Sequence, residues 1–401
     1  MSKPLIFEEG RIAMKTSTPL ATVVIPTYNR ASSLRRALQS VVNLNLSPEQ
    51  YEVVVVDNNS TDDTPKVVQA FLDRGLPFQC VVEIRLSFTQ FARMPPSLLG
   101  GGMASGGLGA AAPIENLPAD NAPQLAAGWF TAARHAGAEA ARGRILSYID
   151  DDVVVDGEWL TAVIDAFQGD EAVGIVGGPI LPMFEVELPG WIKQYYPMSG
   201  WLSLMDRGSQ LHETDHAYGP NSSVRKDVLQ AVGGFPADTI GVEAEGRPGV
   251  VEKPYVGSGD VGLCSRVTQA GYKVMYAPGA LVHHVIPPVR LTKEWWHSRL
   301  AGEGCYHALT QQYVNEESRA TLFRRGLQST WRAAKTAIRY AGSGMKRTGR
   351  ERHEFWISYH LSRARVEFAL AGRPELARQL WEVAVTGVPP EDIDELVRLL
   401  P

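Results

Sequence analysis

Three adjacent aspartates, Asp150, Asp151 and Asp152, stand between two apolar runs at 145–149 and 153–155. Neighbouring carboxylates repel one another and lose hydration when buried, so they are tolerated where a cation or hydrogen-bond donors satisfy them. Their oxygens suit hard ions, and Mg²⁺ or Mn²⁺ is commonly held by one or two carboxylates together with substrate phosphates. A solvated acidic turn is the alternative, but apolar residues on both sides disfavour it. The run therefore predicts a metal–diphosphate site.

The elements that must position these aspartates alternate between strands and helices. Apolar, β-branched runs at 21–26, 51–56 and 78–86 predict buried strands, and the segments between them predict helices. Such alternation indicates a mostly parallel α/β sheet flanked by helices. Ligands bind at the carboxyl ends of parallel strands, where the polar clusters 26–30, 57–59 and 150–152 lie. The three clusters are therefore predicted to converge on one edge.

The remainder of the chain continues this pattern as far as residue 300. Further helices are predicted at 131–141, 157–167, 226–232 and 261–269, and further strands at 173–179, 272–276 and 280–286. The stretch 219–225 is predicted only to precede a helix. Residues 87–127 contain a Gly-, Ala- and Pro-rich insertion, which could form a lid over the site or a spacer of no consequence. We expect an N-terminal extension at 1–20, an α/β domain at 21–300 and a helical region at 301–401.

Composition limits the classes of protein that this chain can represent. A hydrophobic fraction of 44% and a charged fraction of 21% over 401 residues indicate a globular protein with a sizeable core. A net charge of -5 gives no sign of nucleic-acid binding. The three cysteines have no metal-type spacing, and neither a secretory signal nor a membrane-spanning run is present, which predicts a cytoplasmic protein.

The segment after residue 322 is basic, and its apolar residues Leu327, Trp331, Ala334 and Ile338 fall at helical spacing. A basic amphipathic helix can lie on an anionic membrane, here the inner face of the cell membrane. A helical appendage with a solvated basic face is the alternative.

Seven short motifs occur in an order that resembles glycosyltransferase family 2. They are VIPTYNR (24–30), VVDNNSTD (55–62), AARHAG (132–137), YIDDD (148–152), GPNSSVR (219–225), SGDVGLCSR (258–266) and LVHHV (281–285). Each motif alone is weak, but their shared order over residues 21 to about 300 is specific. The resemblance implies the GT-A fold, which is Rossmann-like, and the use of nucleotide-diphosphate sugars.

The resemblance also implies roles for individual residues. Asp152 and His284 would hold the metal, Mg²⁺ or Mn²⁺, with Asp151 beside them and Asp150 touching ribose or metal. Arg30 or Arg134 can offset phosphate charge. The nucleobase pocket would be formed by Pro26, Thr27, Tyr28 and Asp57, although Tyr28 could equally be a core residue.

Asp260 is the expected general base, because an acceptor hydroxyl must lose its proton during transfer. The same residue could be a plain helix N-cap, and the two roles differ in where its side chain points. The family more often has Glu before this Asp, where this chain has Gly259, and more often has Asn where this chain has His135. These departures put a supporting contact and the phosphate contact of Arg134 in doubt.

One base, one metal and no candidate nucleophile predict sugar transfer with inversion, with a UDP-sugar as the expected donor. The acceptor would be a sugar or a lipid-linked glycan of cell-envelope or polysaccharide synthesis. Two rivals remain open. A nucleotidyltransferase has similar metal carboxylates but usually carries a Gly-rich basic loop after the first strand. A non-catalytic scaffold of the same fold could bind nucleotide sugars without turnover.

Overall fold

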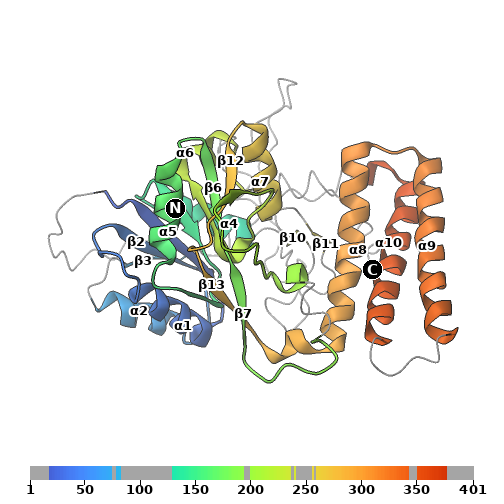
Figure 1. Ribbon diagram of the computed structural model, residues 1–401, viewed down its shortest axis with the longest axis horizontal. Coiled ribbons are helices and arrows are strands. Elements are labelled where there is room, and N and C mark those ends of the chain that lie inside the picture. Colours follow the sequence, from blue (N-terminus) through green and yellow to red (C-terminus); the bar gives the residue numbers. More distant parts are fainter. Residues whose placement is uncertain are drawn as a thin grey trace, which may run out of the picture.

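The computed structural model describes residues 18–74, 78–82, 129–193, 199–235, 239–240, 255–256, 259–342 and 350–376. An α/β part contains the sheets, and three long helices stand beside it at the C-terminal end (Figure 1). The predicted insertion at 87–127 and most of the predicted N-terminal extension lie outside the described residues.

The main sheet has eight strands in the order β3-β2-β1-β4-β9-β6-β12-β8. Its first four strands are parallel, as predicted, and so are β6 and β12. The strands are β1 (Ala21–Thr27), β2 (Tyr51–Asp57), β3 (Phe78–Val82), β4 (Ile145–Tyr148), β6 (Val173–Gly177), β8 (His212–Glu213), β9 (Ser222–Arg225) and β12 (Lys273–Tyr276).

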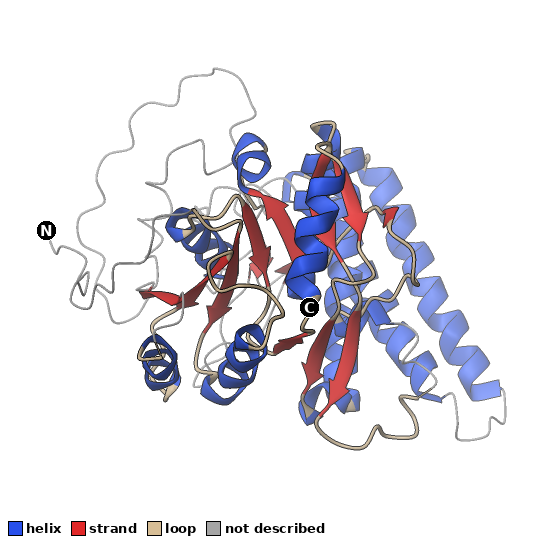
Figure 2. Ribbon diagram, turned by 60° about the vertical axis from the view of Figure 1, so that its left-hand side comes forward, coloured by secondary structure: helices blue, strands red, loops and turns tan. Residues whose placement is uncertain are grey.

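Helices cover both faces of this sheet, because successive residues of its apolar strands point to opposite sides (Figure 2). Val23 and Ile25 of β1 pack in one core with α1 (Ala31–Val42), α2 (Thr64–Leu72) and α5 (Trp159–Gly169). Val24 packs in the other core, which α4 (Trp129–Ala140), α6 (Lys226–Ala231) and α7 (Gly259–Gln269) complete. The predicted α/β architecture is confirmed.

Two smaller sheets complete the α/β part. β5 (Val153–Val155), β13 (Val282–Ile286) and β7 (Ile180–Phe184) form one, with β13 in the middle. β10 (Thr239–Ile240) and β11 (Tyr255–Val256) form the other. The chain passes from β4 in the main sheet to β5 in the second sheet through the short segment that contains Asp150–Asp152. The three aspartates therefore stand where two sheets meet.

Residues 222–225 form β9, a strand that the sequence does not predict. β9 runs antiparallel between β4 and β6 in the middle of the sheet. Its buried serines explain why it is hard to recognise, since polar residues rarely mark a central strand. The hydroxyl of Ser223 donates to that of Ser147 at 3.0 Å, which gives each buried group a partner.

The C-terminal helices are α8 (Lys293–Asn315), α9 (Arg319–Gly342) and α10 (Arg350–Gly372). Aromatic packing joins α8 and α10 to the α/β part, because Trp296 and Phe355 belong to the same core as β1 and contact Trp191. α8 begins before the predicted boundary at residue 300 and ends after it. In the part of the chain that is described, none of the helices has both the length and the apolarity needed to cross a bilayer.

Candidate active site

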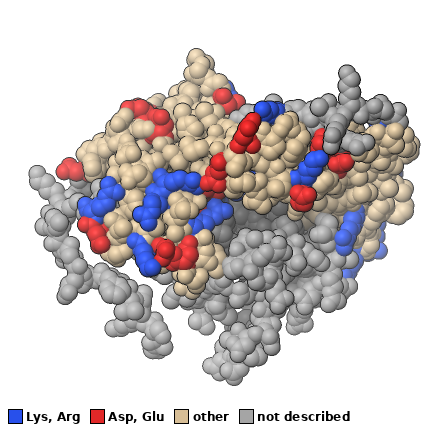
Figure 3. Space-filling model, turned by 90° about the horizontal axis from the view of Figure 1, so that it is seen from below, with Lys and Arg blue, Asp and Glu red and all other residues tan. Residues whose placement is uncertain are grey.

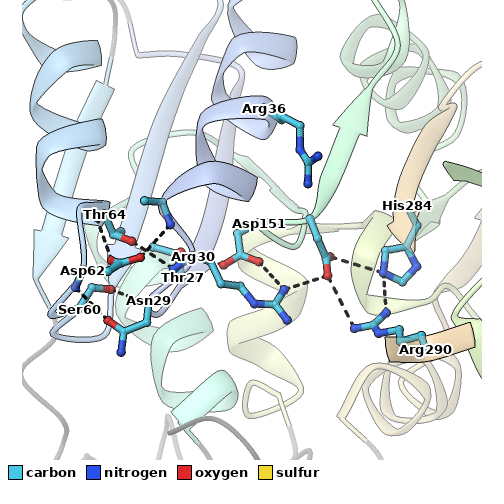
Figure 4. A network of polar contacts seen from close by, with 12 residues as sticks. Thr27, Asn29, Arg30, Arg36, Ser60, Asp62, Thr64, Asp151, His284 and Arg290 are labelled. Carbon is cyan, nitrogen blue, oxygen red and sulfur yellow. Dashed lines mark hydrogen bonds and ion pairs between the residues drawn. The ribbon is translucent and has the colours of Figure 1, made fainter. Parts of the chain in front are cut away.

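The loops after β1 and β2 are held together by side chains that hydrogen-bond each other's backbone. Asn29 adopts φ 51°, a left-handed conformation that asparagine tolerates better than most residues. Its side-chain oxygen accepts from the N–H groups of Thr61 and Asp62, at 2.7 and 3.3 Å. Asp57, buried at the end of β2, accepts from the N–H of Ser60 at 3.0 Å. The two predicted polar clusters are thus one connected unit (Figure 4).

This unit connects directly to the aspartates. The hydroxyl of Thr27 donates to Asp151 at 2.8 Å, and the guanidinium of Arg30 contacts both Asp151 and Asp152, at 3.0 and 2.9 Å. Asp151 and Asp152 are only 5% and 6% exposed, whereas Asp150 is partly exposed. The convergence of polar clusters from β1, β2 and β4 on one edge of the sheet is confirmed.

His284 and Arg290 complete the surroundings of Asp152. His284 lies on β13, and its Nδ1 is 2.9 Å from the carbonyl oxygen of Leu202. Because a carbonyl only accepts, Nδ1 carries a proton and Nε2 faces the site. Nε2 lies 3.4 Å from Asp152 and 2.9 Å from Arg290, whose guanidinium is 3.7 Å from the same carboxylate. Arg30 and Arg290 therefore both contact Asp152, and Figure 4 shows these two arginines with Asp151 and His284.

The sequence interpretation missed Arg290. It follows β13 in the short 3-10 helix Pro288–Leu291, and it reaches the site because β13 pairs with β5, which directly follows the aspartates. The one available signal was a basic residue shortly after a strand that carries a candidate histidine. That signal is weak, since the pairing of β13 with β5 is a long-range contact.

The three carboxylates differ in their tendency to bind protons. Burial raises the pKa of Asp151 to about 7, and the charge of Asp152 adds to this against the opposing charge of Arg30. Burial would also raise the pKa of Asp152, but the neighbouring His284 and the charges of Arg290 and Arg30 hold it well below its usual range. Although part of the residue is exposed, the desolvation of its carboxyl and the charge of Asp152 raise the pKa of Asp150. Of the three carboxylates, Asp152 is thus the one whose charged form the surroundings favour.

Arg134 and Asp260 form a second group beside the aspartates. Arg134 is buried, its guanidinium lies 5.3 Å from the ring of Phe235, and its charge lowers the pKa of Asp150 against the effect of burial. It also packs on Gly219, where an added Cβ would lie 2.6 Å from its Nη2. Asp260 accepts from the N–H of Gly219 at 2.7 Å. Arg134 therefore lies close to Asp260 and acts electrostatically on Asp150.

The side chain of Asp260 also bears on whether it caps a helix. α7 begins at Gly259, so Asp260 lies within the first turn and not before it. One carboxylate oxygen accepts from the N–H of Val261, and the other accepts from the N–H of Gly219, outside the helix. Asp260 is therefore not a plain N-cap.

His135 stands beside Arg134, at the position where the family more often has Asn. Its side chain is buried, and its Nε2 accepts from the N–H of Phe235 at 3.0 Å. His135 thus supports the backbone near Arg134 and does not face the carboxylates through Nε2.

The surroundings of the site carry both signs of charge. On the face seen from below, Lys and Arg side chains gather over the end of the molecule that contains α1 and α2, with acidic side chains among them (Figure 3).

The residues predicted to bind the nucleobase lie at the ends of β1 and β2. Pro26 is buried in β1, and Tyr28 is half-buried in the loop that follows. The structure thus places Pro26, Thr27, Tyr28, Arg30 and Asp57 along two neighbouring strand ends.

Comparison with known proteins agrees with this geometry. The model of the family "Glycosyl transferase family 2" matches residues 22–86 and 127–233, and the gap between the two segments falls within the predicted insertion. A glucosyl-dolichyl phosphate glucuronosyltransferase of Haloferax volcanii is 28% identical over 167 residues, which cover 40% of this chain and 49% of the relative. Glycosyltransferase AglE of the same organism is 24% identical over 69% of this chain and 70% of its own length.

A solved structure supports the fold. The mannosyltransferase of Pyrobaculum calidifontis, solved with GDP-Man and Mn²⁺, superposes with a TM-score of 0.50 at 17% identity, covering 88% of each chain. The match spans about half the length of the first curated relative. The order of the motifs, the family match and the superposed fold lead to one conclusion: residues 22–86 and 127–233 form a glycosyltransferase family 2 domain, and the chain has the GT-A fold.

Proposed function

We propose that the protein transfers a sugar from a nucleotide-diphosphate donor to an acceptor hydroxyl with inversion, and that it requires a divalent ion. A UDP-sugar is the first donor to test, and the acceptor is a sugar or a lipid-linked glycan of envelope or polysaccharide synthesis. The observation that carries the proposal is the contact of Arg30 with both Asp151 and Asp152, which joins the first strand loop to the aspartates at the carboxyl edge of the sheet.

The residues at Asp152 fit a divalent ion. Asp152 offers a charged carboxylate, and Nε2 of His284 offers a lone pair that now accepts from Arg290. Within the described ranges, no group of three or more His, Cys, Asp or Glu side chains could cage an ion without help. The remaining ligands would have to come from the donor diphosphate and water, as is usual for Mg²⁺. When bound, such an ion supplies Lewis acidity to the leaving diphosphate.

Arginines support the negative charge of the donor. Arg30 and Arg290 now neutralise Asp152, and each could turn to phosphate oxygens once a metal takes over that task. Arg134 stands close to Asp150 and could bind the same diphosphate from the other side. The connected loop pair around Asn29 and Asp57 would hold the nucleobase, with Pro26, Thr27 and Tyr28 as its walls and Asp57 accepting from a base N–H.

Asp260 is suited to receive the proton of the acceptor. The N–H of Gly219 fixes its carboxylate outside α7, close to Arg134. A fixed carboxylate near Arg134 and the proposed diphosphate site can accept a proton as the hydroxyl attacks the anomeric carbon from the face opposite the leaving group. This single displacement inverts the configuration and needs no covalent intermediate.

The test separates donor binding from proton transfer. Purified wild type, Asp260→Asn and the control Asp165→Asn, which alters an exposed aspartate of α5, are assayed with a panel of nucleotide sugars and Mn²⁺. We expect Asp260→Asn to lose about 100-fold or more in transfer rate while it binds the donor nucleotide as wild type does. Asp165→Asn should match wild type in both.

Two results would refute the proposal. Transfer by Asp260→Asn at the wild-type rate would exclude this residue as the base. Metal-dependent nucleotide binding by wild type without turnover on any donor, with acceptors present, would favour the scaffold. The anomeric configuration of the product, read by NMR, tests inversion separately.

A further inference from the structure

A row of large apolar side chains is exposed along one side of α9. Phe323, Leu327, Trp331 and Ile338 are 54%, 52%, 62% and 64% exposed. Their spacing of four, four and seven residues brings all of them to one side of a helix. We call these four residues the α9 stripe. Single exposed apolar residues are ordinary, but an aligned row with a tryptophan at its centre marks a contact surface.

Most of the stripe lies away from the face by which α9 joins the protein, although the ring centroid of Phe323 is 5.4 Å from that of Phe368 in α10. That face carries Leu322 and Ala333, which are buried, and Ser329, whose hydroxyl donates to Glu367 of α10 at 2.6 Å. Gly326 lies against the ring of Phe368, where an added Cβ would be 2.7 Å away. α9 also lies farther from the sheet than α8 or α10 (Figure 1). The packing of α9 on α10 thus uses Phe323 at the edge of the stripe, whereas Leu327, Trp331 and Ile338 remain exposed.

Basic side chains border the stripe. Residues 319–342 contain no aspartate or glutamate. Arg324, Arg332, Lys335 and Arg339 are exposed, and none of them forms an ion pair with another of the described residues. Long basic side chains can cover apolar surface with their stems while their charges reach outward to phosphate groups. The pattern therefore complements a surface that is apolar inside and anionic at its edge.

We propose that α9 lies on the surface of an anionic lipid bilayer, with the stripe in the boundary between headgroups and acyl chains and its basic residues on lipid phosphates. Because α9 is not a spanning helix, the contact is interfacial. A second copy of the chain fits less well, because α9 against α9 would bring like charges together without a single acidic partner. The inference does not depend on the proposed transfer activity.

The experiment is flotation of the full-length protein with vesicles. One set contains phosphatidylcholine alone, and the other contains phosphatidylcholine with phosphatidylglycerol. We expect wild type to float with the anionic vesicles, less so as salt is raised, and to stay unbound with the neutral ones. Trp331→Ser combined with Leu327→Ser should lose binding. Arg332→Glu combined with Lys335→Glu should weaken binding about tenfold or more.

Matched variants keep the test specific. Leu211→Ser removes an equally exposed apolar side chain elsewhere, and Arg144→Glu reverses an exposed charge before β4. Both should float as wild type does, and all variants should melt at the wild-type temperature. Failure of wild type to bind anionic vesicles, or unchanged binding by the stripe and charge variants, would overturn the proposal. A dimer in sedimentation that Trp331→Ser abolishes would also overturn it, in favour of a second copy.

Discussion

Buried carboxylates stand at both ends of the parallel strands, and their surroundings differ. At the amino end, Glu52 is 1% exposed and accepts from the hydroxyl of Thr22 at 2.8 Å and from the N–H and Nε of Arg142 at 2.5 and 2.7 Å. At the carboxyl end, Asp151 and Asp152 share Arg30, Arg290 reaches only Asp152, and the charge of Asp152 acts against the charged forms of Asp150 and Asp151. The carboxylate of Glu52 thus has its own hydrogen-bond donors, whereas Asp151 and Asp152 compete for the guanidinium of Arg30.

The difference indicates what each end contributes. A buried charge with a full set of donors stabilises the connection between β1, β2 and β4. Clustered aspartates cost stability and are retained where a ligand completes them. We therefore expect substitutions at Glu52 to change stability, and substitutions at the aspartates to change binding and turnover.

The largest expected effect is on transfer. Asp152→Asn removes the charged carboxylate opposite His284, and we expect transfer to fall by about 100-fold or more because the leaving diphosphate loses its metal. The melting temperature of the metal-free variant should fall only slightly, because the lost ion pairs with Arg30 and Arg290 are largely offset by the relief of repulsion with Asp151 and by the lower cost of burying a neutral amide. Initial rates with the active donor and a thermal melt test both statements. Full activity of the variant, or a melting temperature well below that of wild type, would contradict a role of Asp152 in binding and turnover.

Glu52→Ala should show the opposite pattern. It leaves the Thr22 hydroxyl and two donors of Arg142 without their acceptor, and we expect a loss of about 3 kcal/mol in the free energy of unfolding. Urea unfolding measures this loss, with Glu49→Ala, at an exposed position before β2, as the control. Below its unfolding transition, Glu52→Ala should bind donor as wild type does. Weakened donor binding by the folded variant would contradict the view that Glu52, at the amino end of the strands, serves only stability.

Asp151 predicts a pH dependence of stability. Its pKa is about 7 in the folded protein against an ordinary value of 3.8, so the folded state binds this proton more tightly than the unfolded state. The folded state therefore has its full stability, as far as Asp151 is concerned, below pH 3.8. This stability is lost as the pH rises from there through about 7. Metal-free wild type should therefore lose about 2 kcal/mol between about pH 5 and pH 7 relative to Asp151→Asn. Unfolding at several pH values tests this, and a loss equal in both proteins would contradict it.

The smallest expected effect concerns Arg290. Arg290→Gln keeps a polar side chain but removes its charge, and we expect about tenfold weaker donor binding at unchanged melting temperature. Arg299→Gln, in the adjoining α8, is the control. Donor affinity equal to wild type would show that Arg290 only neutralises Asp152 in the ligand-free state.

The sequence predicts the fold of the first half because its strands are uninterrupted β-branched runs, and a parallel sheet brings strand ends to one edge whatever the exact register. Thr27, Arg30 and the aspartates could thus be placed together from the sequence alone. Arg290 could not, since its place depends on the pairing of β13 with β5. β9 could not either, because Ser222 and Ser223 are polar, and the hydroxyl of Ser223 finds its partner far away in sequence. The predicted basic amphipathic helix is present as α9, and its outward apolar row is visible only once α10 has taken the other face.

The most direct measurement is titration calorimetry of the nucleotide diphosphate that serves the active donor, with and without Mn²⁺, on wild type, Asp152→Asn and Asp165→Asn. Wild type and Asp165→Asn should bind more tightly with Mn²⁺, and Asp152→Asn should bind weakly and equally in both conditions. Metal-dependent binding by Asp152→Asn with the affinity of wild type would contradict the assignment of the carboxyl end of the sheet to the metal and diphosphate.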